Sequence, residues 1–187
     1  MIALRSWFAV VCVLLVCGLL LGSIYIQFVQ GEMPCPLCVL QRLALTFCAA
    51  GPASLLALSR RRDISPRDFC WAYGSSSLAA VFGIAVAVRH VLLHIAPGDP
   101  GYGEPIFGFH LYTWGFFANA AVLVVGSLQL MFLTPESSER WSLKSVGTFV
   151  FGLLALITLV NALSVFAEAG WHPFLPDNPT GYRLFKG

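Results

Sequence analysis

Runs of apolar residues dominate the pattern along this chain, and five of them are long enough to cross a membrane as helices. A transmembrane helix needs about 20 consecutive, mostly apolar residues. Inside a bilayer such a segment must be helical, because its backbone groups have no water to hydrogen-bond. The pattern therefore predicts an all-α, polytopic membrane helix bundle. The five predicted spans cover residues 7–29, 39–58, 70–93, 111–133 and 146–167.

The composition strengthens this prediction, since 58% of the 187 residues are hydrophobic and only 11% are charged. A soluble domain has about 25% charged residues, so this chain cannot cover a water-facing surface. The net charge of +2 is too small to indicate a nucleic-acid partner. The first span is longer than the apolar region of a signal peptide, which predicts a retained helix. Gly18 and Gly22 fit the small-xxx-small pattern and predict close helix packing in that span.

Positive charges fall mainly on one side of the predicted spans. The amino end and the connectors 59–69 and 134–145 together hold seven Lys and Arg residues. Connectors 30–38 and 94–110 hold none, and the carboxyl tail holds two. Cytoplasmic loops carry the excess of Lys and Arg. We therefore predict a cytoplasmic amino terminus and an extracytoplasmic carboxyl terminus.

The strongest chemical signal is a pair of cysteines at the outer end of the second span. Cys35 and Cys38 stand in the sequence Met-Pro-Cys-Pro-Leu-Cys, residues 33–38. Two residues between cysteines is the spacing of thiol–disulfide exchange sites, and disulfides persist in oxidising compartments. Cys38 falls near the first helical turn, where the helix dipole stabilises an anion such as a thiolate. Cys35 is expected to be the more exposed sulfur. The pair is therefore predicted to be redox-active.

Arg42 lies four residues after Cys38, so the two residues share one face of the predicted helix. An arginine inside a membrane span is costly and is a candidate functional residue. We expect Arg42 to lower a cysteine pKa, to bind a carbonyl oxygen of a ligand, or both. The alternative is that its side chain reaches out to the lipid headgroups.

Two other interpretations of the cysteine pair stay open at this point. Cys35 and Cys38 could form half of a zinc site, with His94 and His110 from the other outer connector as further ligands. They could also form a purely structural disulfide, although closing so short a loop stabilises a protein little.

The cysteine motif and Arg42 together carry a resemblance to a known family. With Pro34-Cys35-Pro36-Leu37-Cys38 followed by Arg42, the chain resembles the DsbB family, the membrane disulfide bond formation proteins, over residues 7–133. The resemblance implies a multi-pass protein of the bacterial inner membrane. Its four-helix bundle would pass electrons from a periplasmic thioredoxin-like protein to a quinone, either ubiquinone or menaquinone. It also implies that Cys35 and Cys38 lie next to the quinone, and that Arg42 helps to bind it.

The chain departs from the family pattern in its second outer connector. Residues 94–110 contain no cysteine, whereas family members carry there a second pair that takes electrons from the partner. A smaller departure is Gln41, where many members have Glu. Cys35 and Cys38 then meet a partner directly, or the partner brings its own shuttle, or the scaffold serves another task.

The carboxyl-terminal part extends beyond the four-helix pattern. We expect residues 1–133 to form the DsbB-like core, and residues 134–187 to add a fifth helix and a periplasmic tail. The connector 94–110 and the tail 170–187 are candidates for binding a membrane protein complex.

Basic residues at the end of the third span are further candidates. Because related chains have Arg and His near this place, the resemblance implies that Arg89 and His94 complete a quinone site with Arg42. A histidine there could donate to a quinone oxygen and move a proton. One alternative is that these residues only anchor a helix end at the membrane surface. Another is that His90 and His94, four residues apart, bind a metal or haem together with His110.

The sequence therefore favours a thiol–quinone oxidoreductase embedded in membrane lipid. The partner's thiol is expected to attack Cys35, and Cys38 is expected to pass electrons to the quinone. One alternative is a DsbB-derived, non-catalytic subunit or assembly factor of a membrane or periplasmic complex. Another is a membrane protein that handles a metal or haem.

Overall fold

The computed structural model of the chain describes residues 2–172, 174–176 and 179–185. Within this part, five helices are long and apolar enough to cross a membrane, which confirms the predicted all-α bundle. The helices are α1 (Ile2–Val29), α2 (Pro36–Leu58), α3 (Pro66–Leu93), α4 (Leu111–Phe132) and α5 (Lys144–Ala169), followed by the short 3-10 helix η1 (Arg183–Phe185).

Local capping sets the starts of α2 and α3, which begin before the predicted apolar spans. Ser65 Oγ accepts the backbone N–H of Asp68 at 3.2 Å, and the Asp68 carboxylate accepts the backbone N–H of Ser65 at 3.0 Å. This reciprocal capping box, with Pro66 next to it, starts α3 four residues before residue 70. Cys35 caps α2 in a related way, so that α2 begins at Pro36. Hydropathy therefore predicted the membrane-crossing part of each helix, whereas capping side chains set the starts of α2 and α3.

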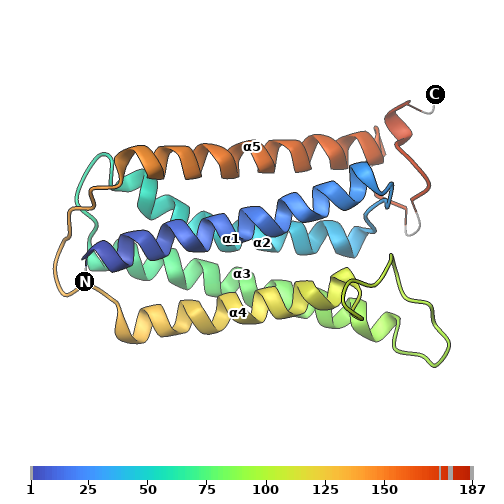
Figure 1. Cartoon of the computed structure of the whole chain (residues 1–187), viewed down its shortest axis with the longest axis horizontal. Helices are drawn as coiled ribbons and strands as arrows, with labels where there is room; N and C mark the ends of the chain where they lie inside the picture. The colour runs from blue at the N-terminus through green and yellow to red at the C-terminus, as the bar shows by residue number, and fades with distance from the viewer. Residues whose placement is uncertain (1, 173, 177–178, 186–187) are drawn as a thin grey trace.

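The helices lie side by side, with α5 along one edge of the bundle, α1 and α2 in the middle, and α3 and α4 along the other edge (Figure 1). Helix α2 is central, because it contacts α1, α3, α4 and α5. Helix α4 packs mainly against α3, and no Cα atom of α1 lies within 8 Å of one in α4. The bundle is therefore not closed between α1 and α4.

Close helix approach occurs at different glycines from those that the sequence suggested. A Cβ atom at Gly51 of α2 would collide with the carbonyl oxygen of Ala72 in α3. By contrast, a Cβ atom at Gly18 or Gly22 would meet nothing within 4 Å, so the predicted close packing at these two glycines is wrong. Small residues therefore bring α2 and α3 together, and α1 is held by other contacts.

One end of the bundle carries the connector 30–35, the loop 94–110 and the carboxyl tail (Figure 1). The loop folds back onto the connector, because the hydroxyl of Tyr102 donates to the carbonyl oxygen of Met33 at 2.6 Å. The backbone N–H of Glu104 donates to the Glu32 carboxylate at 3.0 Å. The loop therefore covers the segment that leads into α2.

The opposite end of the bundle is held by polar contacts between its connectors. Arg5 of α1 forms a buried ion pair with Glu139. Ile64 and Glu139 exchange two backbone hydrogen bonds of 2.8 Å each, beside the buried side chain of Trp141. These contacts tie the amino end of α1 to the connectors that precede α3 and α5.

Candidate redox site

The cysteine pair sits where the chain enters α2. Cys35 is the N-cap residue, and its Sγ accepts the backbone N–H of Cys38 at 3.2 Å. Pro36 takes the first helical position, where the missing N–H of a proline costs nothing. The two sulfur atoms lie 2.9 Å apart, within hydrogen-bond distance of each other. The local sequence thus holds two thiols in contact at the amino end of a membrane helix.

The exposure of the two sulfurs differs from the prediction. Cys35 is only 5% exposed, whereas Cys38 is partly exposed, so the expectation that Cys35 is the more exposed sulfur is wrong. The capping bond turns the Cys35 side chain back toward the helix. There its Sγ lies 3.7 Å from Nε2 of His90, which belongs to α3. Packing between helices, which the local sequence does not encode, therefore buries Cys35.

The surroundings of Cys35 favour its thiolate. A hydrogen bond from the Cys38 thiol lowers the pKa of Cys35 to about 5, and His90 adds to this effect against the opposing effect of burial. Cys35 is therefore a thiolate at neutral pH when the pair is reduced. From the sequence we expected the helix terminus to act on Cys38, whereas in the structure the free backbone N–H of Cys38 donates to Sγ of Cys35.

Arg42 lies one turn below the cysteines and is buried, with 8% of its surface exposed. It donates to Oε1 of Gln27 at 2.6 Å and to the carbonyl oxygen of Ser23 at 3.0 Å, both in α1. The alternative in which Arg42 reaches the lipid headgroups is therefore wrong. Arg42 and Cys38 line the same small cavity of about 70 Å³.

Residues from α3 and α4 surround the other side of the pair. His90 is 1% exposed, and its ring stacks on Tyr112 with ring centroids 4.3 Å apart. Nδ1 of His90 lies 3.4 Å from the side-chain nitrogen of Gln41. His90 is thus fixed between α2 and α4 with its Nε2 directed at Cys35.

Arg89 and His94 do not join Arg42 in one cavity. They line a separate cavity of about 630 Å³ together with Cys35, His90 and Tyr102. Arg89 is exposed, and Nδ1 of His94 pairs with the Asp99 carboxylate at 3.1 Å. The cysteine pair therefore separates two cavities, one on the Arg42 side and one beneath the loop 94–110.

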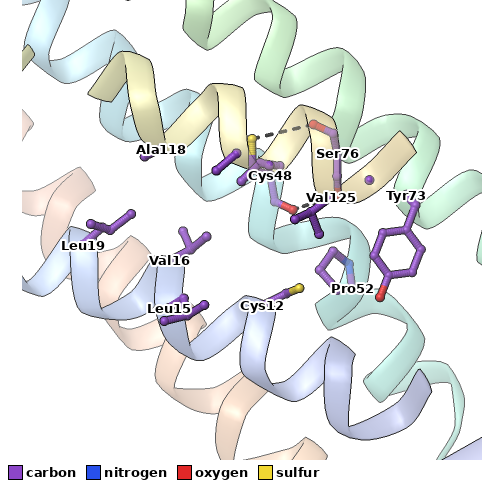
Figure 2. A pocket seen from close by; sticks show the side chains of 13 residues that line it. Cys12, Leu15, Val16, Leu19, Cys48, Pro52, Tyr73, Ser76, Ala118 and Val125 are labelled. Carbon is purple, nitrogen blue, oxygen red and sulfur yellow. Dashed lines mark hydrogen bonds between the residues drawn. The ribbon is translucent and has the colours of Figure 1, made fainter. Parts of the chain in front are cut away.

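The cavity beside Cys38 and Arg42 adjoins a larger apolar cavity of about 300 Å³, and Leu19 and Ala118 line both. Figure 2 shows this larger cavity, with Leu15, Val16 and Leu19 of α1 on one side and Ala118 and Val125 of α4 on the other. Helices α2 and α3 contribute Cys48, Pro52, Tyr73 and Ser76 to its lining. Two adjoining, largely apolar cavities therefore extend from the redox pair into the bundle, between α1 and α4.

The arrangement also bears on the metal alternative. Among the described residues, Cys35, Cys38 and His90 place one possible ligand atom each within 4.8 Å of one another, and neither His94 nor His110 joins this group. Two thiolates on one tetrahedral zinc ion would lie about 3.8 Å apart, given Zn–S bonds of about 2.3 Å. The sulfurs are 2.9 Å apart, which is closer than zinc ligation would leave them. The geometry therefore favours a dithiol over a zinc site.

Sequence reasoning missed three residues around the pair. His90 was considered only as a metal ligand, although its ring nitrogen contacts Cys35. Gln27 and Glu168 were not considered, although Gln27 binds Arg42 and Glu168 is fully buried nearby. A signal was present for Glu168, since a carboxylate inside an apolar span is a candidate functional residue in its own right.

Five membrane-crossing helices with a dithiol capping one of them define the chain as a multi-pass membrane protein of the thiol-redox class. The sequence profile described as "Disulfide bond formation protein DsbB" matches residues 5–103, which is more than half of the chain. The chain therefore belongs to the DsbB family, and it is a protein of the bacterial inner membrane.

Individual relatives carry the same description. "Disulfide bond formation protein B 1" of Pseudomonas savastanoi pv. phaseolicola is 42% identical over 78 residues, which cover 42% of this chain and 43% of the relative. "Disulfide bond formation protein B" of Cupriavidus necator is 41% identical over 93 residues, which cover 50% of this chain and 53% of the relative. The chain thus spans about half the length of the curated relatives that it matches. No solved structure matches the chain.

Proposed function

We propose that this protein is a thiol–quinone oxidoreductase, which passes two electrons from a periplasmic thioredoxin-like dithiol protein through Cys35 and Cys38 to a membrane quinone, either ubiquinone or menaquinone. The observation that carries the proposal is the cavity that Cys38 and Arg42 line together and that adjoins a larger apolar cavity. It joins a redox-active sulfur, a buried hydrogen-bond donor and room for an apolar molecule.

The residues on the Arg42 side fit a quinone, which has two carbonyl oxygens on a ring and a long apolar tail. A bound quinone would accept two electrons and two protons. Arg42 would hold a carbonyl oxygen, because its bonds to Gln27 and Ser23 use two of the five N–H donors of a guanidinium. The apolar cavity between α1 and α4 would hold part of the tail.

Electrons would enter from the other side of the pair. Cys35 lines the cavity beneath the loop 94–110, at the end of the bundle that positive-charge asymmetry assigns to the periplasm. A partner thiolate would attack Cys35 Sγ, which breaks the Cys35–Cys38 disulfide and releases Cys38 beside the cation of Arg42. Because Cys35 is buried, the loop with Tyr102 must move to admit the partner.

The second exchange step would return the pair to its dithiol form. The partner's other thiol would attack the mixed disulfide, so that a disulfide forms in the partner and Cys35 leaves. A thiol with a lowered pKa leaves faster, and the pKa of Cys35 is lowered to about 5. Since residues 94–110 hold no cysteine, this exchange takes place directly on the membrane pair.

Quinone reduction by the purified protein tests the proposal. With a reduced thioredoxin-like partner and a short-chain quinone, we expect the quinone absorbance to fall for the wild type. We expect no turnover for Cys38→Ser or Cys35→Ser, because neither variant can form the disulfide. Cys70→Ser is the matched control, because Cys70 is exposed near the opposite end of the bundle. Unchanged turnover in Cys38→Ser would overturn the proposal.

A further inference from the structure

A glutamate in the last turn of α5 lies buried close to the redox pair. Glu168 is 0% exposed, and neither carboxylate oxygen has a hydrogen-bond partner among the described residues. A buried carboxylate without a partner is costly, and the cost falls when the group is protonated or faces a cation. Ionisable residues kept inside a membrane span at such a cost are candidate functional groups.

Glu168 belongs to a polar stripe on α5 that faces the arginine of α2. Asn161, Ser164 and Glu168 are the buried polar residues of this helix, and they repeat at helical spacing. Ser164 accepts a hydrogen bond of 2.6 Å from Gln27, which in turn accepts the bond from Arg42. Helix α5 therefore extends the polar environment of the site on the side away from α4.

The charges around Glu168 come from several elements. Arg42 and Cys35 lie close enough for their charges to act on Glu168, and Glu168 acts on Tyr102 of the loop 94–110. Helix α5 packs against α1, α2 and η1. From α1 the nearby polar group is the uncharged Gln27. The titratable and charged groups near this end of α5 include Cys35, Cys38, Arg42, Tyr102, Tyr182 and Arg183. Glu32 acts on Tyr102, and His90 contacts Cys35.

We propose that Glu168 takes up a proton when the Cys35–Cys38 disulfide is reduced and gives it up when the pair is oxidised again. The inference rests on the proposed function, because it assigns a role within the same redox cycle. Glu168 would hold this proton, and it would act on Arg42 and on the cysteine pair through its charge, without touching either sulfur.

Charge balance in the buried site gives the physical reason. With the disulfide formed, the cation of Arg42 is matched by the Glu168 carboxylate. With the pair reduced, the Cys35 thiolate, which His90 also contacts, adds a second anion to the surroundings of Arg42 and Glu168. Protonating Glu168 at that moment keeps the site neutral in both redox states, which avoids the cost of an unpaired buried charge.

The electrons and protons of the cycle balance with this assignment. Reduction breaks the Cys35–Cys38 bond with two electrons and two protons, all of which a partner dithiol releases as it forms its own disulfide. One proton goes to Cys38 and the other to Glu168, while Cys35 stays a thiolate. On reoxidation the Cys35–Cys38 bond forms again, and Cys38 and Glu168 release the two protons that quinol formation needs.

Infrared difference spectra of the reduced against the oxidised protein, recorded without quinone or partner protein, test the proposal directly. We expect reduction to produce a carboxylic-acid C=O band in the wild type that shifts in D₂O. The band should be absent in Glu168→Gln and present, at a changed frequency, in Glu168→Asp. Glu104→Gln is the matched control, because it makes the same substitution at an exposed site on the same side of the bundle.

The pH dependence of the pair's redox equilibrium is the second readout. Reduction that takes up two protons makes the equilibrium constant fall about 100-fold per pH unit against a pH-independent reference, whereas one proton gives about tenfold. We expect about 100-fold for the wild type and Glu104→Gln, and about tenfold for Glu168→Gln. A purely structural role for Glu168 would leave this slope unchanged.

The two outcomes that overturn the proposal are separate from those that overturn the proposed function. A wild type without the carboxylic-acid band, or equal pH slopes in Glu168→Gln and Glu104→Gln, would overturn the role of Glu168. If Glu168→Gln does not fold, the wild-type and Glu168→Asp spectra still decide. Because quinone is absent from these measurements, a protein that fails to reduce quinone would leave the result for Glu168 intact.

Discussion

At the residue scale, the sequence could place the candidate groups that lie together at the start of one helix, but not those that packing brings to them. The proximity of Cys35, Cys38 and Arg42 was predictable, because spacings of three and four residues place them close together at the start of α2. His90 stands 55 residues from Cys35 along the chain, and no local pattern indicates that its ring nitrogen contacts that sulfur. The same limit explains why Cys35 was wrongly expected to be the more exposed of the two cysteines.

The first residue-scale prediction concerns the reactivity of Cys35 in the reduced protein. Because the pKa of Cys35 is lowered to about 5, its thiolate is complete at neutral pH and is lost as the pH falls through that value. We expect the rate of Cys35 alkylation by iodoacetamide to rise from acid pH, to be half-maximal near this pKa, and then to level off. Mass spectrometry of the Cys35 peptide in a Cys70→Ser background measures the rate.

A substitution of His90 tests the cause of the lowered Cys35 pKa. Replacing His90 by Gln removes one of the groups that stabilise the thiolate, so the midpoint of the alkylation curve should move up toward the ordinary range for a cysteine. His172→Gln serves as control, because His172 is exposed in the tail. A wild-type midpoint near the value of about 8.5 that is usual for a free cysteine would contradict the lowered pKa.

At the element scale, the length and hydropathy of the apolar runs predicted five spans, and the structure has five matching helices within its described residues. The gap between α1 and α4 could not be predicted from these runs, because hydropathy says that a helix is apolar without saying what it faces. In a membrane, lipid covers an apolar surface as readily as another helix does. The unpaired faces of α1 and α4 therefore leave no mark in the sequence.

The second prediction tests whether this gap admits the quinone. Ala118 of α4 lines both the cavity beside Arg42 and the larger apolar cavity. Ala118→Phe should fill the space where the two cavities meet and raise KM for a long-chain quinone by about tenfold, which corresponds to about 1.4 kcal/mol of lost binding. Partner oxidation by the cysteine pair in a single turnover should be unaffected, because Cys35 lies on the other side.

A matched substitution on the lipid-facing side of the same helix is the control for Ala118→Phe. Val124 is 57% exposed, so Val124→Phe adds an aromatic ring to α4 outside both cavities. We expect its KM to equal that of the wild type. Equal KM values for Ala118→Phe and Val124→Phe would show that the quinone neither enters nor binds through the gap between α1 and α4.

At the scale of the whole molecule, the bundle places every group of the proposed reaction at one end. The pair, the loop 94–110 and the carboxyl end of α5 gather there, whereas the arginine-rich connector after α2 lies at the other end (Figure 1). The family profile ends at residue 103, so α4 and α5 lie beyond it, and yet α5 contributes the buried Glu168. The part of the chain beyond the family match therefore places a buried carboxylate close to the cysteine pair.

The last prediction is the orientation of this assembly in the membrane. Since Lys and Arg gather in cytoplasmic loops, the end that carries Arg61 should face the cytoplasm and the end that carries Glu104 the periplasm. Both residues are exposed, so Glu104→Cys and Arg61→Cys present comparable thiols in a Cys70→Ser background. In intact spheroplasts, an impermeant maleimide should label Glu104→Cys at once and Arg61→Cys only after permeabilisation. The reverse pattern would place Cys35 on the reducing side of the membrane, where an oxidised pair could not be maintained by a periplasmic partner.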